Sequence, residues 1–166
     1  MGRYRPPAAK KSPYITSEGH ERLSTELEDL WPRRREVVAA LSAAAAEGDR
    51  SENAEYIYRK KQLREMDRRI RYLQKRLDEL KIVSNTPADP NKVFFAAWVE
   101  LEDEQGDCVR YRIVGPDEFD EQPDWISVDS PVARAVLGKS LDDEVIVKTP
   151  QGGVVYIITD IEYSNA

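Results

Sequence analysis

Apolar side chains recur at alternating steps of four and three along the first half of the chain. Between residues 23 and 44 they are Leu23, Leu27, Leu30, Val37, Leu41 and Ala44, with Arg34 in the slot between Leu30 and Val37. A second series consists of Leu63, Met66, Ile70, Leu73, Leu77 and Leu80, with Tyr56 one heptad before Leu63. Such steps place apolar residues along one side of a helix, as in a coiled-coil seam. The two series predict two long amphipathic helices.

A short break separates the two apolar series. The first ends just before Gly48 and the second begins just after it, so the economical arrangement is an antiparallel helical hairpin whose seams face each other. Each arm of about 30 residues would be ~45 Å long. Pro32 lies inside the first arm, where a missing N–H group and a ring clash cost about 3 kcal/mol in a continuous helix. We therefore expect this helix to kink or restart at Pro32.

After residue 92 the pattern changes to runs of aromatic and β-branched residues, most of them bounded by Gly, Pro or Asp. These runs predict strands at residues 93–101, 108–115, 125–128, 144–149 and 153–163. A hairpin turn is predicted at "TPQGG", and a short helix after Ser130, with Pro131 in its first turn and Gly138 at its end. The predicted fold class is α+β, with a coiled-coil hairpin followed by an antiparallel β domain that carries a short helix.

Composition predicts the domain boundaries. We expect a flexible N-terminal extension at 1–14, the hairpin at 15–84 with its acidic tip at 47–55, a linker at 85–92 and the β domain at 93–166. Charge divides the chain in the same place, because residues 1–84 hold 19 Lys and Arg against 14 Asp and Glu, whereas residues 85–166 hold 6 against 17. The resulting net charges of +5 and −11 make the protein electrically two-sided.

Several classes of function are disfavoured by the residue types that the sequence lacks. Cys108 is the only cysteine and His20 the only histidine, so an internal disulfide, a zinc cluster and a Cys–His pair do not fit. A single cysteine suits a reducing compartment, and no run approaches the roughly 18 apolar residues that a membrane span requires. We expect a cytoplasmic protein without a membrane segment, and we interpret His20 as a surface residue.

One face of the second predicted helix carries a row of cations. Opposite the seam, at spacings of three and four, stand Lys61, Arg64, Arg68, Arg71 and Lys75, with Lys60 beside them. A solvated coiled-coil surface explains such a row, but this one holds no acidic residue and would repel itself unless a polyanion came to it. Nucleic acid backbone is the natural candidate. Because few aromatic residues lie nearby, we expect contacts with phosphates rather than stacking on bases.

The connection between the two predicted helices is acidic. Asp49 and Glu52 are three residues apart, and two interpretations are open for them. As the N-cap and the third residue of the second helix, they would form a capping box that also suits the helix dipole. As carboxylates on one edge of a protruding tip, they would be ligands for a divalent cation such as Mg²⁺, which prefers six oxygens. Two carboxylates do not make a cage, so the tip would have to complete another protein's site.

Six segments together resemble bacterial transcript cleavage factors of the Gre family, in the GreB branch. They are "GDRSENAEY", "REMDRRIRYLQKRL", "LKIV", "KVFFAAWVE", "RIVG" and "ISVDSPVARAVLGK", in this order, and the resemblance runs from about Pro13 to Tyr163. It implies an FKBP-like fold for the β domain. It also implies that the hairpin enters the secondary channel of RNA polymerase in a backtracked complex and that its tip reaches the polymerase active centre.

The resemblance also assigns roles to residues. Asp49 and Glu52 would be the catalytic carboxylates of this chain and would help hold a weakly bound Mg²⁺ jointly with the polymerase, which then cleaves the extruded 3′ end of the nascent RNA. The protein would be no enzyme on its own and would hold no metal stably by itself. The row of cations would guide the RNA. The loop formed by Asp129, Ser130 and Pro131 would contact the polymerase, although it also fits the N-cap of the short helix. We expect a monomer.

Two other functions are compatible with these residues. One is a non-catalytic regulator that binds in the secondary channel and competes with cleavage factors; the presence of Asp49 and Glu52 favours cleavage over this alternative. The other is a free coiled-coil RNA chaperone, which would use the row of cations but leave the β domain without a role.

Overall fold

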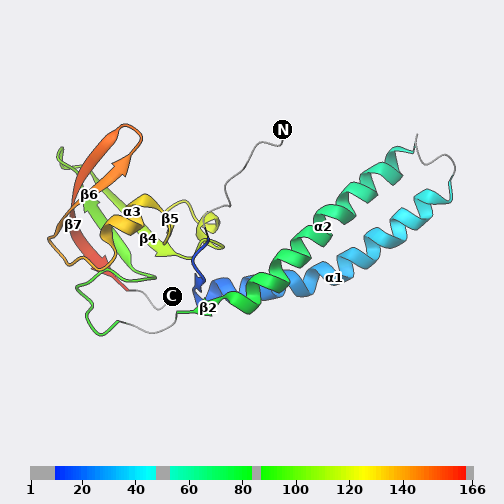
Figure 1. Cartoon of the computed structure of the whole chain (residues 1–166), viewed down its shortest axis with the longest axis horizontal. Helices are drawn as coiled ribbons and strands as arrows, with labels where there is room; N and C mark the ends of the chain where they lie inside the picture. The colour runs from blue at the N-terminus through cyan, green and yellow to red at the C-terminus, as the bar shows by residue number, and fades with distance from the viewer. Residues whose placement is uncertain (1–9, 48–52, 84–86, 164–166) are drawn as a thin grey trace, which may run out of the picture. The chain divides into compact units, whose positions relative to one another are not determined.

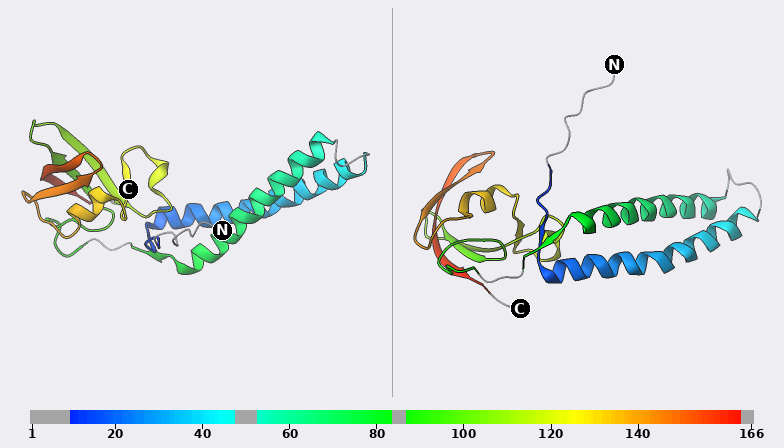
Figure 2. Two further views of the ribbon diagram at one scale, coloured as in Figure 1. Left: turned by 45° about the horizontal axis from the view of Figure 1, so that its top comes forward. Right: turned by 60° about the horizontal axis from the view of Figure 1, so that its bottom comes forward.

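The computed structural model describes residues 10–47, 53–83 and 87–163 of the 166-residue chain. The chain separates into two compact units. The helical unit holds residues 18–80, and the sheet unit combines the chain before residue 18 with the chain after residue 80. Figures 1 and 2 show the long helices of the first unit and the curled sheet of the second. No helix among the described residues is long and apolar enough to cross a membrane.

The helical unit consists of α1 (Ser17–Ala45) and α2 (Ala54–Glu79). Side-chain contacts fix the direction in which the helices run. Glu26 of α1 pairs with Arg69 of α2 at 2.7 Å, and Arg34 pairs with Asp67, also at 2.7 Å. Because the partner's number falls as the α1 number rises, the helices are antiparallel, and the predicted hairpin is confirmed.

The predicted seam is also observed. In α1 the buried apolar side chains fall seven residues apart, at Leu23, Leu30, Val37 and Ala44. In α2 the buried residues are Ile70, Leu73 and Arg76. α1 continues through Pro32 without restarting, and Figure 2 shows it bending gently along its length. Pro32 and Glu28 are both exposed, so water can solvate the backbone carbonyl that the proline leaves without an N–H partner.

The sheet unit is built on five strands in the order β5-β4-β3-β7-β6. Their bounds are β3 (Trp98–Glu102), β4 (Cys108–Val114), β5 (Trp125–Ser127), β6 (Glu144–Thr149) and β7 (Gly152–Glu162). All neighbours are antiparallel except β4 and β5, which are parallel. A short 3₁₀ helix, η1 (Phe119–Glu121), precedes β5, and α3 (Pro131–Val136) follows it. The predicted fold class is confirmed, although one strand pair makes the sheet mixed.

One face of this sheet forms the core against α3. Val99, Leu101, Ile113 and Ile158 point into it from three strands, and α3 contributes Ala133 and Val136. The β6–β7 hairpin closes at the predicted turn, with Thr149 opposite Gly152 in the register. Gly138 has a φ of 78° just after α3, a left-handed conformation that glycine adopts without strain, as expected for the end of a helix.

The predicted strand at 93–101 begins five residues late. Val93 and Ala97 are fully buried, but the backbone between them turns, with Ala96 at a φ of 72°. The hydroxyl of Tyr163 accepts a hydrogen bond from the Phe94 N–H at 2.9 Å. The residue that follows the last strand thus supplies a hydrogen-bond acceptor for the backbone of this turn. Burial raises the pKa of that hydroxyl, which keeps it protonated. Apolar composition alone does not distinguish such a buried turn from a strand.

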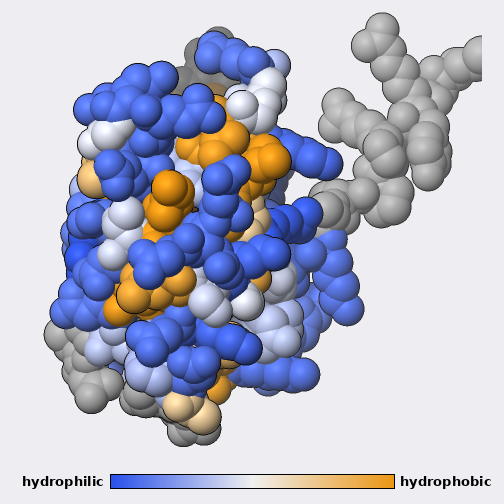
Figure 3. Space-filling model, turned by 90° about the vertical axis from the view of Figure 1, so that its left-hand side faces the viewer, coloured by the Kyte–Doolittle hydropathy of each residue, from blue (hydrophilic) through white to orange (hydrophobic). Residues whose placement is uncertain are grey.

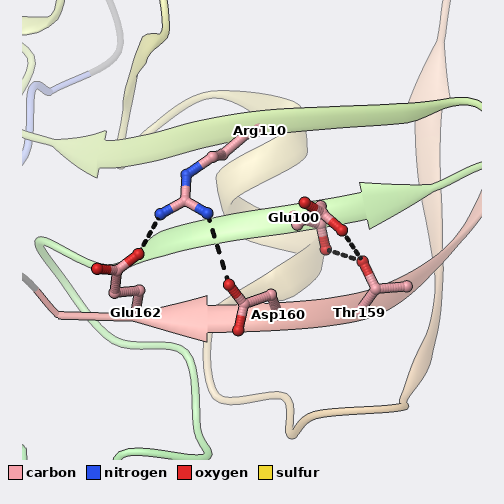
Figure 4. Close-up of polar contacts among 5 residues, drawn as sticks. All are labelled: Glu100, Arg110, Thr159, Asp160 and Glu162. Atoms are coloured by element: carbon pink, nitrogen blue, oxygen red, sulfur yellow. Dashed lines mark hydrogen bonds and ion pairs between the residues drawn. The ribbon is translucent and has the colours of Figure 1, made fainter.

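The exposed face of the sheet carries a group of polar contacts. Figure 4 shows Arg110 reaching from β4 across β3 to two carboxylates of β7, Asp160 at 3.5 Å and Glu162. Beside them the Thr159 hydroxyl lies 2.9 Å from Glu100. Apolar side chains are scattered among hydrophilic ones over the surface seen in Figure 3. Each of these exposed ion pairs contributes only about 0–1 kcal/mol, so this face adds little to the stability that the core supplies.

A small parallel pair completes the sheet unit. It joins β1 (Tyr14–Ile15) to β2 (Lys81–Ile82). Thr16, directly after β1, is held by Glu118, whose carboxylate accepts hydrogen bonds from the Thr16 N–H at 2.9 Å and from the Thr16 hydroxyl. The same carboxylate accepts the Gly115 N–H at 2.9 Å, and Glu118 is fully buried. The short strands were not predicted, because two-residue strands lack a detectable hydrophobic period.

Candidate functional site

The cations predicted on α2 form an exposed row. Lys60, Lys61, Arg64, Arg68, Arg71 and Lys75 are all exposed. Within the residues that the structure describes, none of these six forms an ion pair. We call them the basic stripe. Other arginines of the same helix are paired: Arg59 with Glu55 at 2.8 Å and Arg69 with Glu26 at 2.7 Å.

This division of the α2 cations has an electrostatic consequence. Arg69 helps join the helices, and its hydrogen bond lowers the pKa of Glu26, so this pair contributes stability that is lost as the pH falls through the lowered pKa. Within the described residues, the basic stripe forms no ion pair that joins the two helices. Like charges at spacings of three and four repel each other on a helix, and a chain of phosphates relieves that repulsion. The surface is therefore suited to a polyanion.

The acidic residues Asp49 and Glu52 lie outside the described residues, but the helix next to them is defined. α2 begins at Ala54 with Asn53 as its N-cap, and the Asn53 side chain accepts a hydrogen bond from the Tyr56 N–H at 3.1 Å. The interpretation of Asp49 as the N-cap, with Glu52 as its capping-box partner, is therefore wrong. α2 begins at Ala54, close to its first seam residue Tyr56, whereas a capping box at Asp49 and Glu52 would have started the helix earlier.

Asn53 also links the two helices to each other. Its amide nitrogen donates a hydrogen bond to the carbonyl oxygen of Ala44, in the last turn of α1, at 2.7 Å. One side chain thus accepts a hydrogen bond from an N–H group in the first turn of α2 and donates one to a carbonyl in the last turn of α1, where helix groups lack intrahelical partners of their own type. Sequence reasoning missed this role. The available signal was that Asn ranks with Asp as an N-cap and stands directly before the apolar series.

The predicted contact loop lies between β5 and α3. Ser130 is the N-cap of α3, and its hydroxyl accepts the Ala133 N–H at 3.3 Å, which confirms the helix-cap interpretation of this residue. Pro131 begins the helix, as expected. An open pocket of about 480 Å³ adjoins the loop. Its lining consists of Asp129, Pro131, Arg134, Ala135, Ile146 and Lys148.

The pocket combines several kinds of contact. Ile146 is 63% exposed, which is unusually high for a branched apolar residue within a strand. Arg134 and Lys148 add positive charge beside the Asp129 carboxylate. Asp129 itself is held by Ser12, whose N–H donates to one carboxylate oxygen at 2.9 Å and whose hydroxyl donates to the other. This contact joins residues 117 positions apart, and no local pattern indicates it.

Two further observations concern metal binding and thiol chemistry in the described residues. Within those ranges, no group of three or more His, Cys, Asp or Glu side chains could hold a metal ion. Cys108 is exposed, and local desolvation together with neighbouring carboxylates, including Glu100 and Glu102, raises its pKa. A raised pKa keeps the thiol protonated and therefore a poor nucleophile.

Comparison with known proteins identifies the family. Residues 13–82 match the family model described as transcription elongation factor, N-terminal, and residues 86–163 match transcription elongation factor, GreA/GreB, C-term. A Pseudomonas aeruginosa protein named transcription elongation factor GreB is 59% identical over 167 residues, covering 100% of this chain and 99% of that protein. The chain belongs to the GreA/GreB family of transcription elongation factors. The resemblance stated from sequence is confirmed.

Two further curated relatives agree with this assignment to the GreA/GreB family. Proteins with the same GreB name are 59% identical in Yersinia pestis, over 92% of this chain and 90% of that protein, and 57% identical in Haemophilus influenzae, over 93% and 99%. Among solved structures, the transcription factor Gfh1 is 25% identical over 93% of this chain and 99% of its own, with a TM-score of 0.44.

Proposed function

We propose that this GreA/GreB family member binds bacterial RNA polymerase in the cytoplasm, as a monomer, and stimulates cleavage of the 3′ end of nascent RNA in backtracked complexes. The hairpin would enter the secondary channel, and the polymerase would perform the cleavage. Support comes from the family assignment and from the exposed basic stripe on α2, which forms no ion pair within the described residues. The stripe is the observation that carries the proposal, because it supplies a surface for the extruded RNA along the arm that leads to the acidic residues.

Asp49 and Glu52 would provide the chemistry at the end of that arm. Their carboxylate oxygens suit Mg²⁺, and the polymerase would supply the remaining ligands of the ion. When bound, Mg²⁺ lowers the pKa of a coordinated water and stabilises negative charge on phosphate oxygens. The role of this chain is to bring two carboxylates to the polymerase. The assignment of Asn53 as the N-cap supports this role, because the helix does not need Asp49 as its cap.

The contact loop would anchor the factor. Asp129, Ser130 and Pro131 stand beside a pocket with one strongly exposed apolar side chain and two cations, which is a combination suited to a protein partner. We propose this surface as the docking site on polymerase. A non-catalytic regulator that competes with cleavage factors would dock in the same way but would not shorten RNA.

Transcript length tests the proposed function directly. Stalled polymerase complexes with 3′-labelled RNA should release short labelled fragments within minutes when the purified protein and Mg²⁺ are added, and much more slowly without the protein. The protein alone, free of polymerase and of contaminating nuclease, should leave the same RNA intact, because two carboxylates do not organise a two-metal site. Binding without any acceleration of cleavage would favour the non-catalytic regulator.

The basic stripe should act on RNA rather than on the fold. Replacing Arg64 and Arg68 together with Ala is expected to slow the rescue of deeply backtracked complexes by roughly tenfold at low salt, with a smaller effect on shallow ones. The difference from the wild-type protein should shrink as salt rises, because screening shortens to roughly 8 Å at physiological ionic strength. Cleavage rates measured for complexes with long and short extruded RNA check this prediction.

A matched control is available on the same helix. Replacing Arg59 and Arg69 with Ala removes the same charge from α2, but at positions paired with Glu55 and Glu26. This control should reduce the stability of the hairpin slightly and should not discriminate between long and short extruded RNA. Equal losses for both double variants at both lengths would show that the stripe acts only through overall charge or scaffolding.

A further inference from the structure

The Asp129 carboxylate is fixed from outside its own loop. Ser12 donates its backbone N–H to Oδ2 at 2.9 Å and its hydroxyl to Oδ1, so both carboxylate oxygens are engaged by one residue. Within the loop, the Asp129 N–H donates to the Ser127 hydroxyl at 3.1 Å. Backbone and side chain of Asp129 are therefore both held. Asp129 as a residue is partly exposed and lines the pocket proposed for docking.

Ser12 is itself held in a rigid segment. The Pro13 carbonyl accepts the Lys81 N–H at 2.7 Å, and the Ile15 carbonyl accepts the Val83 N–H at 2.9 Å. Ile15 is fully buried. Four residues after Ser12, Thr16 binds the buried Glu118 in the same way, with its N–H and its hydroxyl on one carboxylate. The segment from 12 to 16 is thus attached to the sheet unit at both ends and can orient a side chain.

We propose that Ser12 is a positioning residue for polymerase docking. It would hold the Asp129 carboxylate in the conformation that the polymerase binds, so that this side chain need not be ordered on association. This inference rests on the proposed function, since it takes the loop at Asp129 as the docking site.

The opposite role would be a latch in which Ser12 competes with polymerase for Asp129. The two roles predict opposite changes in the affinity for polymerase when Ser12 is replaced. Under the positioning proposal, Ser12→Ala removes the hydroxyl donor, frees the carboxylate to rotate and weakens binding by about three- to tenfold. Ser12→Thr keeps the hydroxyl and should restore most of the affinity. If Ser12 instead competed with polymerase for Asp129, the Ser12→Ala variant would bind polymerase more tightly than the wild-type protein does.

The experiment uses the full-length chain and stalled elongation complexes of bacterial RNA polymerase. Equilibrium binding is measured by competition with a fluorescently labelled wild-type protein, and each variant is first checked for native circular dichroism. Thr16→Ala is the matched control, because it removes an equivalent hydroxyl bond four residues away but from Glu118, which does not belong to the loop. It should lower the melting temperature more than Ser12→Ala does and leave the affinity of the folded protein unchanged.

Each outcome has a distinct meaning. Ser12→Ala should lose most of its effect when Asp129 is already Ala, since the two residues act as one unit. Wild-type affinity for Ser12→Ala, tighter binding, or an equal loss in Thr16→Ala would overturn the positioning role. If Asp129→Ala itself binds normally, the docking site lies elsewhere and the assignment of Ser12 falls with it. If the wild-type protein does not bind polymerase at all, the proposed function fails first.

Discussion

Replacing Asp49 with Asn is expected to reduce cleavage stimulation by roughly 100-fold or more while polymerase binding stays near the wild-type level. The amide keeps the shape of the side chain but lacks the negative charge that attracts a hard divalent cation. The proposed docking loop is far along the chain and is unchanged. Rates of transcript shortening and competition binding, measured on the same stalled complexes, check the two halves of this prediction.

The controls for Asp49 follow from the structure. Glu47→Gln removes one charge from the exposed residue at the other end of the same connection and should retain most of the activity. Because Asn53 caps α2, an effect of Asp49→Asn cannot be assigned to loss of the helix cap. Raised Mg²⁺ should restore part of the cleavage by mass action. Near-normal cleavage by the Asn variant at limiting Mg²⁺ would contradict the metal-binding role.

Replacing Glu118 with Ala should lower the free energy of unfolding of the sheet unit by about 3–5 kcal/mol. The carboxylate accepts the N–H groups of Thr16 and Gly115, each at 2.9 Å, and also the Thr16 hydroxyl. Glu118 is fully buried and Thr16 is 5% exposed, so water cannot readily replace the lost acceptor. Urea unfolding followed by tryptophan fluorescence, with Trp98 and Trp125 reporting on the sheet unit, measures the loss.

Glu118→Gln separates hydrogen bonding from packing at this position. The amide oxygen can still accept both N–H groups, and the amide nitrogen can donate to the Thr16 hydroxyl, so the expected loss is only about 1 kcal/mol. The volume of the side chain is nearly unchanged. If Gln destabilises the sheet unit as much as Ala does, then the negative charge rather than the number of acceptors holds this junction.

The regular parts of the fold were predictable because they repeat. The heptad pattern gave both long helices, and Leu23, Leu30, Val37 and Ala44 are buried as expected. The β6–β7 hairpin and the cap of α3 have local turn and capping signals. By contrast, the parallel pairing of β5 with β4 and the β1–β2 pair depend on contacts between distant residues. The local sequence does not predict which distant strands pair with each other.

The candidate site was predictable to different degrees. The basic stripe follows from helical spacing, and its six residues are exposed as a row. The cap of α2 was misassigned because Asp49, Ser51 and Asn53 all have side chains suited to capping, and residue type does not rank them. The bond from Ser12 to Asp129 could not be anticipated, because it requires knowing that the chain before α1 returns to the sheet unit.

The side-chain amide of Asn53 links the two helices without using the proposed metal ligands Asp49 and Glu52. It joins the end of α1 to the start of α2 through Ala44 and Tyr56, and neither contact uses a residue between 48 and 52. Substitutions in that stretch therefore leave these two hydrogen bonds in place. The proposed role of Asp49 and Glu52 in cleavage could therefore be altered by a few substitutions without a compensating change in the helices.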